Sequence, residues 1–290
     1  MPRSPERGWL RPIVTFAVFA AFLFVIWEGL KFVGGDPWRT ETWIWEPPLE
    51  IWLASDLLLP HVWDIVGALA APVQRGSDES LAQFLAGAAF YTWREAAIGF
   101  LLGATIGIGL AALFVHSKLM ERALVPYVIA SQTIPIIALA PMIVFAFGPN
   151  VLSVVIIATY LTFFPVTIAM ISGLRSPDPR ALELMRSYAA SRWSVFWKVR
   201  MPASLPYLFT ALKISATASI VGAIVGEGPG GIPNGLGRAI INFNSQYISG
   251  PEKLWATIVA CAILGIAFFT LIRIAELAAL RGRGLRTEAA

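Results

Sequence analysis

The stretch RSPDPRALELMRSYAASRWSVFWKVRMPASLP, residues 175–206, is a charged segment between two long apolar runs. Asp178 can cap a helix whose first residue is Pro179, and apolar residues then recur along one face of that helix. Ser191 can cap a second short helix, which Pro202 is expected to end. The stretch therefore predicts two short amphipathic helices lying at a membrane surface.

The rest of the chain has the composition of an integral membrane protein. Hydrophobic residues make up 57% of the 290 residues, charged residues make up 14%, and the mean hydropathy is +0.70. A soluble core of this size needs far less apolar sequence. The isoelectric point near 9.4 is explained by membrane topology, so no nucleic acid partner is expected. The single cysteine, Cys261, lies in an apolar run and is interpreted as core packing.

The apolar runs predict an all-α protein with six transmembrane helices. The expected spans are residues 13–33, 94–115, two spans within 123–174, 207–225 and 254–274. Residues 123–174 contain no Asp, Glu, Lys or Arg, and Gly148-Pro149-Asn150 divides them. A secretory signal peptide is the alternative for the first run, but its apolar region would be shorter and no small-residue cleavage site follows.

The second span begins with Arg94-Glu95, which we expect to pair at the membrane interface. Gly99, Gly103 and Gly107 recur every four residues within it. This spacing places small residues in one stripe, where another helix can approach closely.

Residues 34–93 form a segment rich in tryptophan and proline, typical of a membrane interface. Two pieces, 49–59 and 61–71, are candidates for short helices on the outer surface. A small folded cap is the equally weighted alternative.

Basic residues indicate the orientation. With both termini in the cytoplasm, most of them fall on the cytoplasmic side, as the positive-inside rule requires. Those residues are Arg3, Arg7, Arg11, Lys118, Arg122, Arg175, Arg180, Arg186, Arg192, Lys198, Arg200, Arg281, Arg283 and Arg286. The expected organisation is a first helix with its amino-terminal segment (1–33), an extracytoplasmic segment (34–93), a core (94–278) and a basic cytoplasmic tail (279–290).

The third and fourth spans are candidates for a translocation path, because prolines in spanning helices leave carbonyls that need protein or water around them. Kinking for helix packing is the alternative at any single position. The candidate residues are Gln132, Thr133, Pro135 and Pro141 in the third span and Thr159, Tyr160 and Thr162 in the fourth.

The charged segment resembles a known family. The pattern of Glu183, Ala189-Ala190-Ser191, Pro202 and Pro206 is similar to the cytoplasmic "EAA" loop of bacterial ABC importer permeases. The run from Gln132 to Pro141 resembles the third-span signature of the same family, and the likeness extends over roughly residues 90–278. Two departures stand out: Glu183-Leu184-Met185 replaces Glu-Ala-Ala, and Ala189 replaces a glycine. Alanine reaches a left-handed bend less readily than glycine does.

The resemblance implies a type I ABC importer permease fold, working as a homodimer in the lipid of the bacterial inner membrane. It implies two partners, an ABC ATPase that binds loop 175–206 and an extracytoplasmic solute-binding protein. ATP and Mg would be used by the ATPase, and this chain would bind no cofactor. In the loop, Glu183 would anchor the ATPase groove, Arg186 and Arg192 would pair with acidic or carbonyl groups, and Pro202 would set the angle into the fifth span. Ala189 and Ser191 would form the bend.

Within the family, the likeness is to permeases for sulfonates, taurine and nitrate, and several segments look more like permeases for vitamins and their precursors. Riboflavin or the pyrimidine precursor of thiamine is the first expectation for the solute, and a sulfonate, taurine or nitrate is the alternative.

Enzyme chemistry is poorly supported. The chain has no G-x-x-x-x-G-K-S/T phosphate loop, no H-E-x-x-H and no G-x-S-x-G motif. A proton-coupled transporter needs an ionisable residue buried in the membrane, and the third and fourth spans offer none. A channel or secondary transporter without an ATPase, and a scaffold without transport, remain alternatives.

Overall fold

The computed structural model describes residues 10–39, 44–49, 51–74, 76–228 and 232–281, most of which are helical. Residues 282–290 of the expected basic tail, and Arg3 and Arg7 near the amino terminus, lie outside these residues. The chain divides into two units, Met1–Phe84 with Asn242–Ala256, and Leu85–Ile241 with Thr257–Ala290.

The first unit contains α1 (Leu10–Gly34), the two-residue antiparallel strands β1 (Trp38–Arg39) and β2 (Ile44–Trp45), the 3-10 turn η2 (Trp52–Ala54) and α2 (Val62–Ala70). Polar groups bind the end of α1 to the segment before α2. Glu28 accepts from the Val62 backbone N–H (2.9 Å) and contacts His61 Nδ1 (2.7 Å). Lys31 Nζ donates to Asp56 and to the Leu59 carbonyl. The predicted first helix is confirmed, and of the two expected outer helices only the second forms, because residues 49–59 contain a single 3-10 turn.

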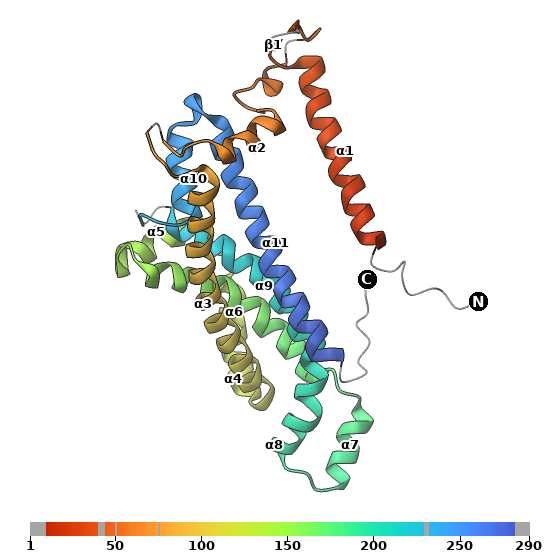
Figure 1. Cartoon of the computed structure of the whole chain (residues 1–290). Helices are drawn as coiled ribbons and strands as arrows, with labels where there is room; N and C mark the ends of the chain where they lie inside the picture. Colours follow the sequence, from red (N-terminus) through yellow and green to blue (C-terminus); the bar gives the residue numbers. More distant parts are fainter. Residues whose placement is uncertain (1–9, 40–43, 50, 75, 229–231, 282–290) are drawn as a thin grey trace, which may run out of the picture. The chain divides into compact units, whose positions relative to one another are not determined.

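The second unit holds most of the remaining helices. They are α3 (Leu81–His116), α4 (Lys118–Ser131), α5 (Ile136–Phe147), α6 (Val151–Arg175), α7 (Pro179–Ser187), α8 (Arg192–Val195), the π-helical segment η3 (Phe196–Arg200), α9 (Met201–Glu227), α10 (Leu236–Ser245) and α11 (Pro251–Arg281), with a 3-10 turn η4 (Tyr247–Ser249) before α11 (Figure 1). The first residues of α3, the end of α10, η4 and the start of α11 belong to the first unit.

Small residues let α3, α6 and α9 approach closely. A Cβ at Gly103 of α3 would lie 2.5 Å from Thr162 Cβ of α6, and one at Gly107 would lie 2.8 Å from the Phe163 carbonyl. A Cβ at Gly222 of α9 would lie 3.1 Å from Ala158 Cα of α6. The glycine stripe predicted for the second span therefore packs against the fourth span.

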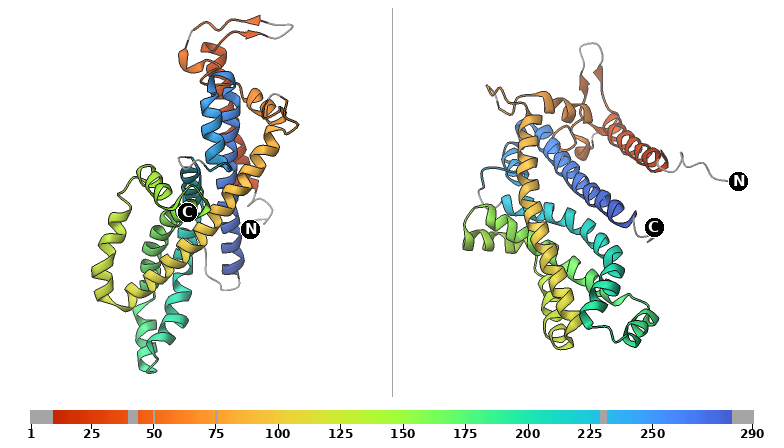
Figure 2. Two further views of the ribbon diagram at one scale, coloured as in Figure 1. Left: turned by 90° about the vertical axis from the view of Figure 1, so that its left-hand side faces the viewer. Right: turned by 60° about the horizontal axis from the view of Figure 1, so that its bottom comes forward.

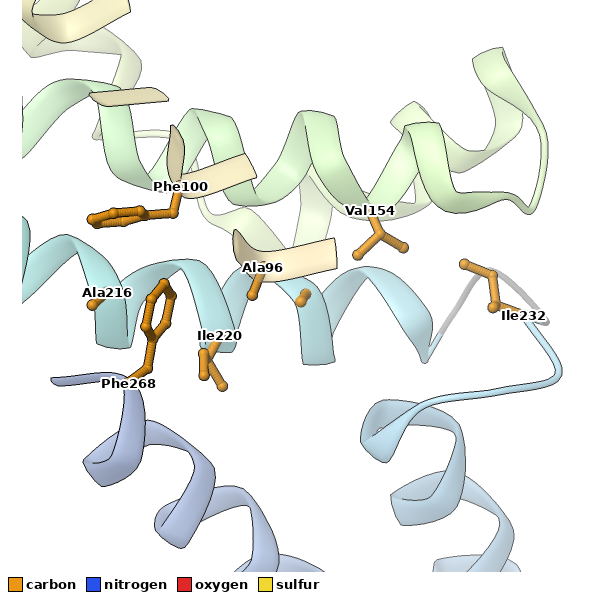
Figure 3. Packing of buried hydrophobic residues seen from close by; sticks show 8 residues of the cluster. Ala96, Phe100, Val154, Ala216, Ile220, Ile232 and Phe268 are labelled. Atoms are coloured by element: carbon orange, nitrogen blue, oxygen red, sulfur yellow. The ribbon is translucent and has the colours of Figure 1, made fainter. Parts of the chain in front are cut away.

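A buried apolar cluster joins these helices to α11 (Figure 3). Phe268 of α11 points toward Ala216 and Ile220 of α9, and its ring centroid lies 5.1 Å from that of Phe100 on α3. This packing positions the helices that carry the site.

Within the described ranges, five helices are long and apolar enough to cross a membrane, and α4 with α5 makes a sixth candidate if this bent pair is one span. The expected third span is broken: α4 and α5 meet at 99° across residues 132–135 (Figure 2). Pro135 has no N–H to continue the helix and disfavours helical geometry at the residue before it.

The second span begins earlier than predicted, at Leu81 rather than Arg94. Ser80 Oγ accepts from the Gln83 N–H (3.3 Å), and the Gln83 side chain accepts in return from the Ser80 N–H (3.2 Å). This capping box begins the helix well before the charged pair. The prediction that Arg94 and Glu95 pair at the interface is wrong, because Glu95 is fully buried and Arg94 is exposed.

Candidate functional site

The first helix of the charged segment forms as predicted. The Asp178 carboxylate accepts from the Arg180 N–H (2.8 Å), and Pro179 is the first residue of α7. No residue of α7 is buried, so Glu183 and Arg186 are both exposed to a partner. Figure 1 shows α7 and α8 at one end of α6 and α9.

A left-handed bend follows α7 at Ala189, whose φ is 49°. The Ala189 N–H donates to the Arg186 carbonyl (2.9 Å), and the Ala190 N–H donates to the Met185 carbonyl (3.0 Å). These two bonds form a Schellman motif, which usually has glycine at the left-handed position. The helix–helix bend therefore forms at Ala189, although alanine adopts this left-handed conformation less readily than glycine.

Ser191 caps α8, because its hydroxyl accepts from the Ser194 N–H (3.2 Å). The prediction that Pro202 ends this second helix is wrong. α8, η3 and α9 run on as one 36-residue helical span, Arg192–Glu227, with Pro202 in the first turn of α9. A π-helical turn widens the backbone just before Pro202, which accommodates a ring that would clash with the carbonyl four residues earlier in an α-helix.

The candidate path residues fall into two groups. Gln132, Thr133 and Pro135 lie at the break between α4 and α5, and the Tyr160 hydroxyl of α6 donates to the Ser131 carbonyl at the same break. Gln132 Nε2 and Thr159 Oγ1 are buried and have no hydrogen-bond partner among the described residues.

The other candidates lie elsewhere. Thr162 is buried against Gly103 of α3, and its hydroxyl donates to the Ala158 carbonyl of its own helix (2.9 Å). Pro141 is exposed within α5. The structure thus brings Gln132, Thr133, Pro135 and Tyr160 together and separates Thr162 from them.

Two buried acidic residues were not among the predicted site residues. Glu95 of α3 and Glu227 of α9 are both 0% exposed. The sequence signal was present, since Glu95 stands inside a helix-length apolar run and Glu227 directly follows one. The sequence predicts Glu95 at the membrane interface and ends the fifth expected span at residue 225, before Glu227. Elsewhere in the described ranges, no three His, Cys, Asp or Glu side chains gather as metal ligands.

Known proteins resemble much of this chain in sequence. A family model described as binding-protein-dependent transport system inner membrane component matches residues 103–279. The formylaminopyrimidine transport permease protein of Halalkalibacterium halodurans is 37% identical over 61% of this chain and 69% of that protein. The riboflavin transport system permease protein of Chloroflexus aurantiacus is 32% identical over 56% of this chain. The matched part makes up 59% of that protein, which is less than two thirds of its length.

Other relatives carry other substrate names, such as an aliphatic sulfonates transport permease protein of Bacillus subtilis at 30% identity. Among solved structures, an amino acid ABC transporter crystallised with histidines shares the fold, with a TM-score of 0.55 and 18% identity over 67% of this chain and 94% of that one.

Proposed function

The chain belongs to the family of binding-protein-dependent transport system inner membrane components, and we propose that it is the membrane-spanning subunit of an ATP-driven importer of a small heteroaromatic solute. As a member of this family it is a multi-pass protein of the bacterial inner membrane. Its partners would be ABC ATPase subunits and an extracytoplasmic solute-binding protein, and it would work as a homodimer.

The observation that carries the proposal is the continuity of α8, η3 and α9. An exposed loop is joined without a break to a helix that is apolar and long enough to span the membrane. Movement of an ATPase surface bound to α7 and α8 would therefore be transmitted directly into the fifth span. Such a lever lets nucleotide bias two states of the membrane helices at a distance.

The exposed side chains of the loop fit a role in binding the ATPase. Glu183 and Arg186 lie on α7 and Arg192 begins α8, all of them exposed. The Schellman bend at Ala189 fixes the angle between the two helices, and the Ser191 cap begins the second one. We assign Glu183 to anchoring and the two arginines to charge pairing with the partner.

The break between α4 and α5 fits a role in solute passage. Gln132 at the break and Thr159 on α6 have buried polar groups without hydrogen-bond partners among the described residues. Tyr160, next to Thr159 on α6, lies at the break itself. No charged residue occurs between positions 123 and 174. Uncharged donors and acceptors suit a neutral heteroaromatic solute better than an anion. The names of the formylaminopyrimidine and riboflavin relatives support the same class, with sulfonate, taurine or nitrate as the alternative.

The test is reconstitution of the chain with its ATPase and binding protein, as wild type and as Glu183→Arg. We expect wild type to hold the ATPase during purification and to import a labelled pyrimidine precursor or riboflavin only with ATP. The charge reversal should release the ATPase and abolish uptake. Glu79→Arg, a reversal at an exposed position outside the loop, is the matched control.

Two results would contradict the proposal. Uptake without the ATPase would indicate a channel or secondary transporter, and full binding and uptake by Glu183→Arg would remove the loop from coupling. Taurine and nitrate, added as competitors, test the substrate class separately from the transport reaction itself.

A further inference from the structure

Two carboxyl groups lie together inside the second unit. Glu95 and Glu227 are both fully buried. Backbone hydrogen bonds bring them together, because Leu236 donates to Thr92, one turn before Glu95 on α3, and the next residue, Gly237, donates to Glu227. The two carboxyl groups interact with each other. Both oxygens of Glu95 and Oε1 of Glu227 accept no hydrogen bond from any donor in the described part of the chain. Three carboxyl oxygens thus lie in an apolar interior without a formed hydrogen bond, although the Tyr91 hydroxyl lies near Glu95. This is costly unless one group carries a proton or a cation.

The remaining oxygen of Glu227 binds the first turn of α10. Its Oε2 accepts from the Gly237 N–H (2.7 Å), and the neighbouring Leu236 N–H donates to Thr92 Oγ1 of α3 (2.9 Å). The backbone wraps the carboxyl group so closely that a Cβ at Gly235 would lie 2.3 Å from it, at a φ of 100°. Glu227 and Thr92 together hold α10 against α9 and α3.

Nothing among the facing charged groups neutralises two carboxylates. The other titratable groups that interact with the pair are Tyr91 and Arg94 on α3 and Cys261 on α11. Arg94 is exposed, with its guanidinium 5.6 Å from the centre of the Tyr91 ring. It does not reach the two Glu95 carboxyl oxygens, which have no hydrogen-bond partner among the described residues. Two adjacent carboxylates in a low-dielectric interior cannot both be ionised, whereas one shared proton removes the repulsion and supplies the missing donor.

We propose that Glu95 and Glu227 form a proton-binding site, in which one proton is held between the two carboxyl groups and fixes α10 against α3 and α9. Loss of that proton leaves two like charges in contact and loosens the first turn of α10. The arrangement is therefore stable while the proton is bound and is lost as the pH rises. The site involves neither the transported solute nor the ATPase, so a test of the site and a test of the proposed function can have different outcomes.

The direct test is infrared difference spectroscopy of the full-length protein in lipid nanodiscs, titrated from about pH 6 to about pH 9. Wild type should show the carbonyl stretch of a protonated carboxylic acid at neutral pH, and this band should fade as the pH rises. Glu95→Gln and Glu227→Gln should each lose the band. Glu79→Gln, which removes an exposed carboxyl group, should keep it.

A second readout reports what the proton does. In wild type, hydrogen exchange of the Gly237 amide, corrected for the chemical effect of pH, should speed up about tenfold or more across the same range, because local opening becomes easier. In Glu95→Gln, which cannot become charged, this pH dependence should disappear while the slow exchange remains. A residue with a merely structural role would slow or speed exchange equally at every pH.

The wild-type titration alone can overturn the proposal, so it does not depend on the folding of a variant. Absence of the acid band at every pH would show that no proton is held. If exchange at Gly237 then depended on Na⁺ or K⁺, a metal cation would occupy the pair instead. Persistence of the band in the double variant Glu95→Gln with Glu227→Gln, which retains neither carboxyl group, would place the protonated group elsewhere.

Discussion

Ala189 occupies a backbone region that costs an L-residue with a Cβ roughly 1–2 kcal/mol. Ala189→Gly should therefore stabilise the bend by about 1 kcal/mol, which slows local opening of α7 roughly fivefold. Hydrogen exchange of the α7 amides checks this. Ala190→Gly is the matched control, because Ala190 has no positive φ and should lose stability. Equal or faster exchange in Ala189→Gly would show that the bend stores no such strain.

Single residues also show where sequence reasoning succeeds. The caps at Asp178 and Ser191 were predicted correctly because a cap depends on only a few neighbouring residues. Glu95 and Glu227 were missed because their burial depends on helices distant in sequence. Glu95 would lie at the interface only if the second span began at Arg94. The capping box at Ser80 begins α3 at Leu81 instead, so Glu95 lies well inside the helix.

At the scale of elements, the contact between α3 and α6 depends on the absence of side chains. Gly103→Ala would place a Cβ 2.5 Å from Thr162 and 2.7 Å from the Thr159 carbonyl, and we expect a loss of about 1–3 kcal/mol. Gly109→Ala, on the same helix with nothing within 4 Å, should be neutral or stabilising by up to about 1 kcal/mol. Thermal denaturation of the purified protein measures both. Equal melting temperatures for the two variants would contradict the close approach.

Helix existence was predictable and helix boundaries were less so. The apolar runs located every long helix, and the glycine stripe identified the packing face of α3. The break between α4 and α5 and the π-helical turn before Pro202 were not foreseen. Proline restricts the backbone in either case, but whether a helix breaks, as at Pro135, or adapts, as at Pro202, depends on the hydrogen bonds available around it.

At the scale of the whole molecule, the asymmetry of basic residues predicts six spans with both termini in the cytoplasm. On a Cys261→Ala background, Tyr188→Cys and Pro149→Cys supply exposed reporters in the second unit. We expect a membrane-impermeant maleimide to label position 149 only in intact cells and position 188 only in inverted vesicles. Labelling of both from one side would overturn the predicted orientation.

The unbroken helix Arg192–Glu227 is longer than a membrane crossing requires. Its 36 residues extend about 54 Å, whereas the hydrocarbon layer is about 30 Å thick. Even a strong tilt uses up only part of that surplus. The distance between the charged loop and the membrane surface is therefore set by the length of this helix and by the thickness of the bilayer. A thinner or thicker membrane would change that distance without altering a single residue of the loop.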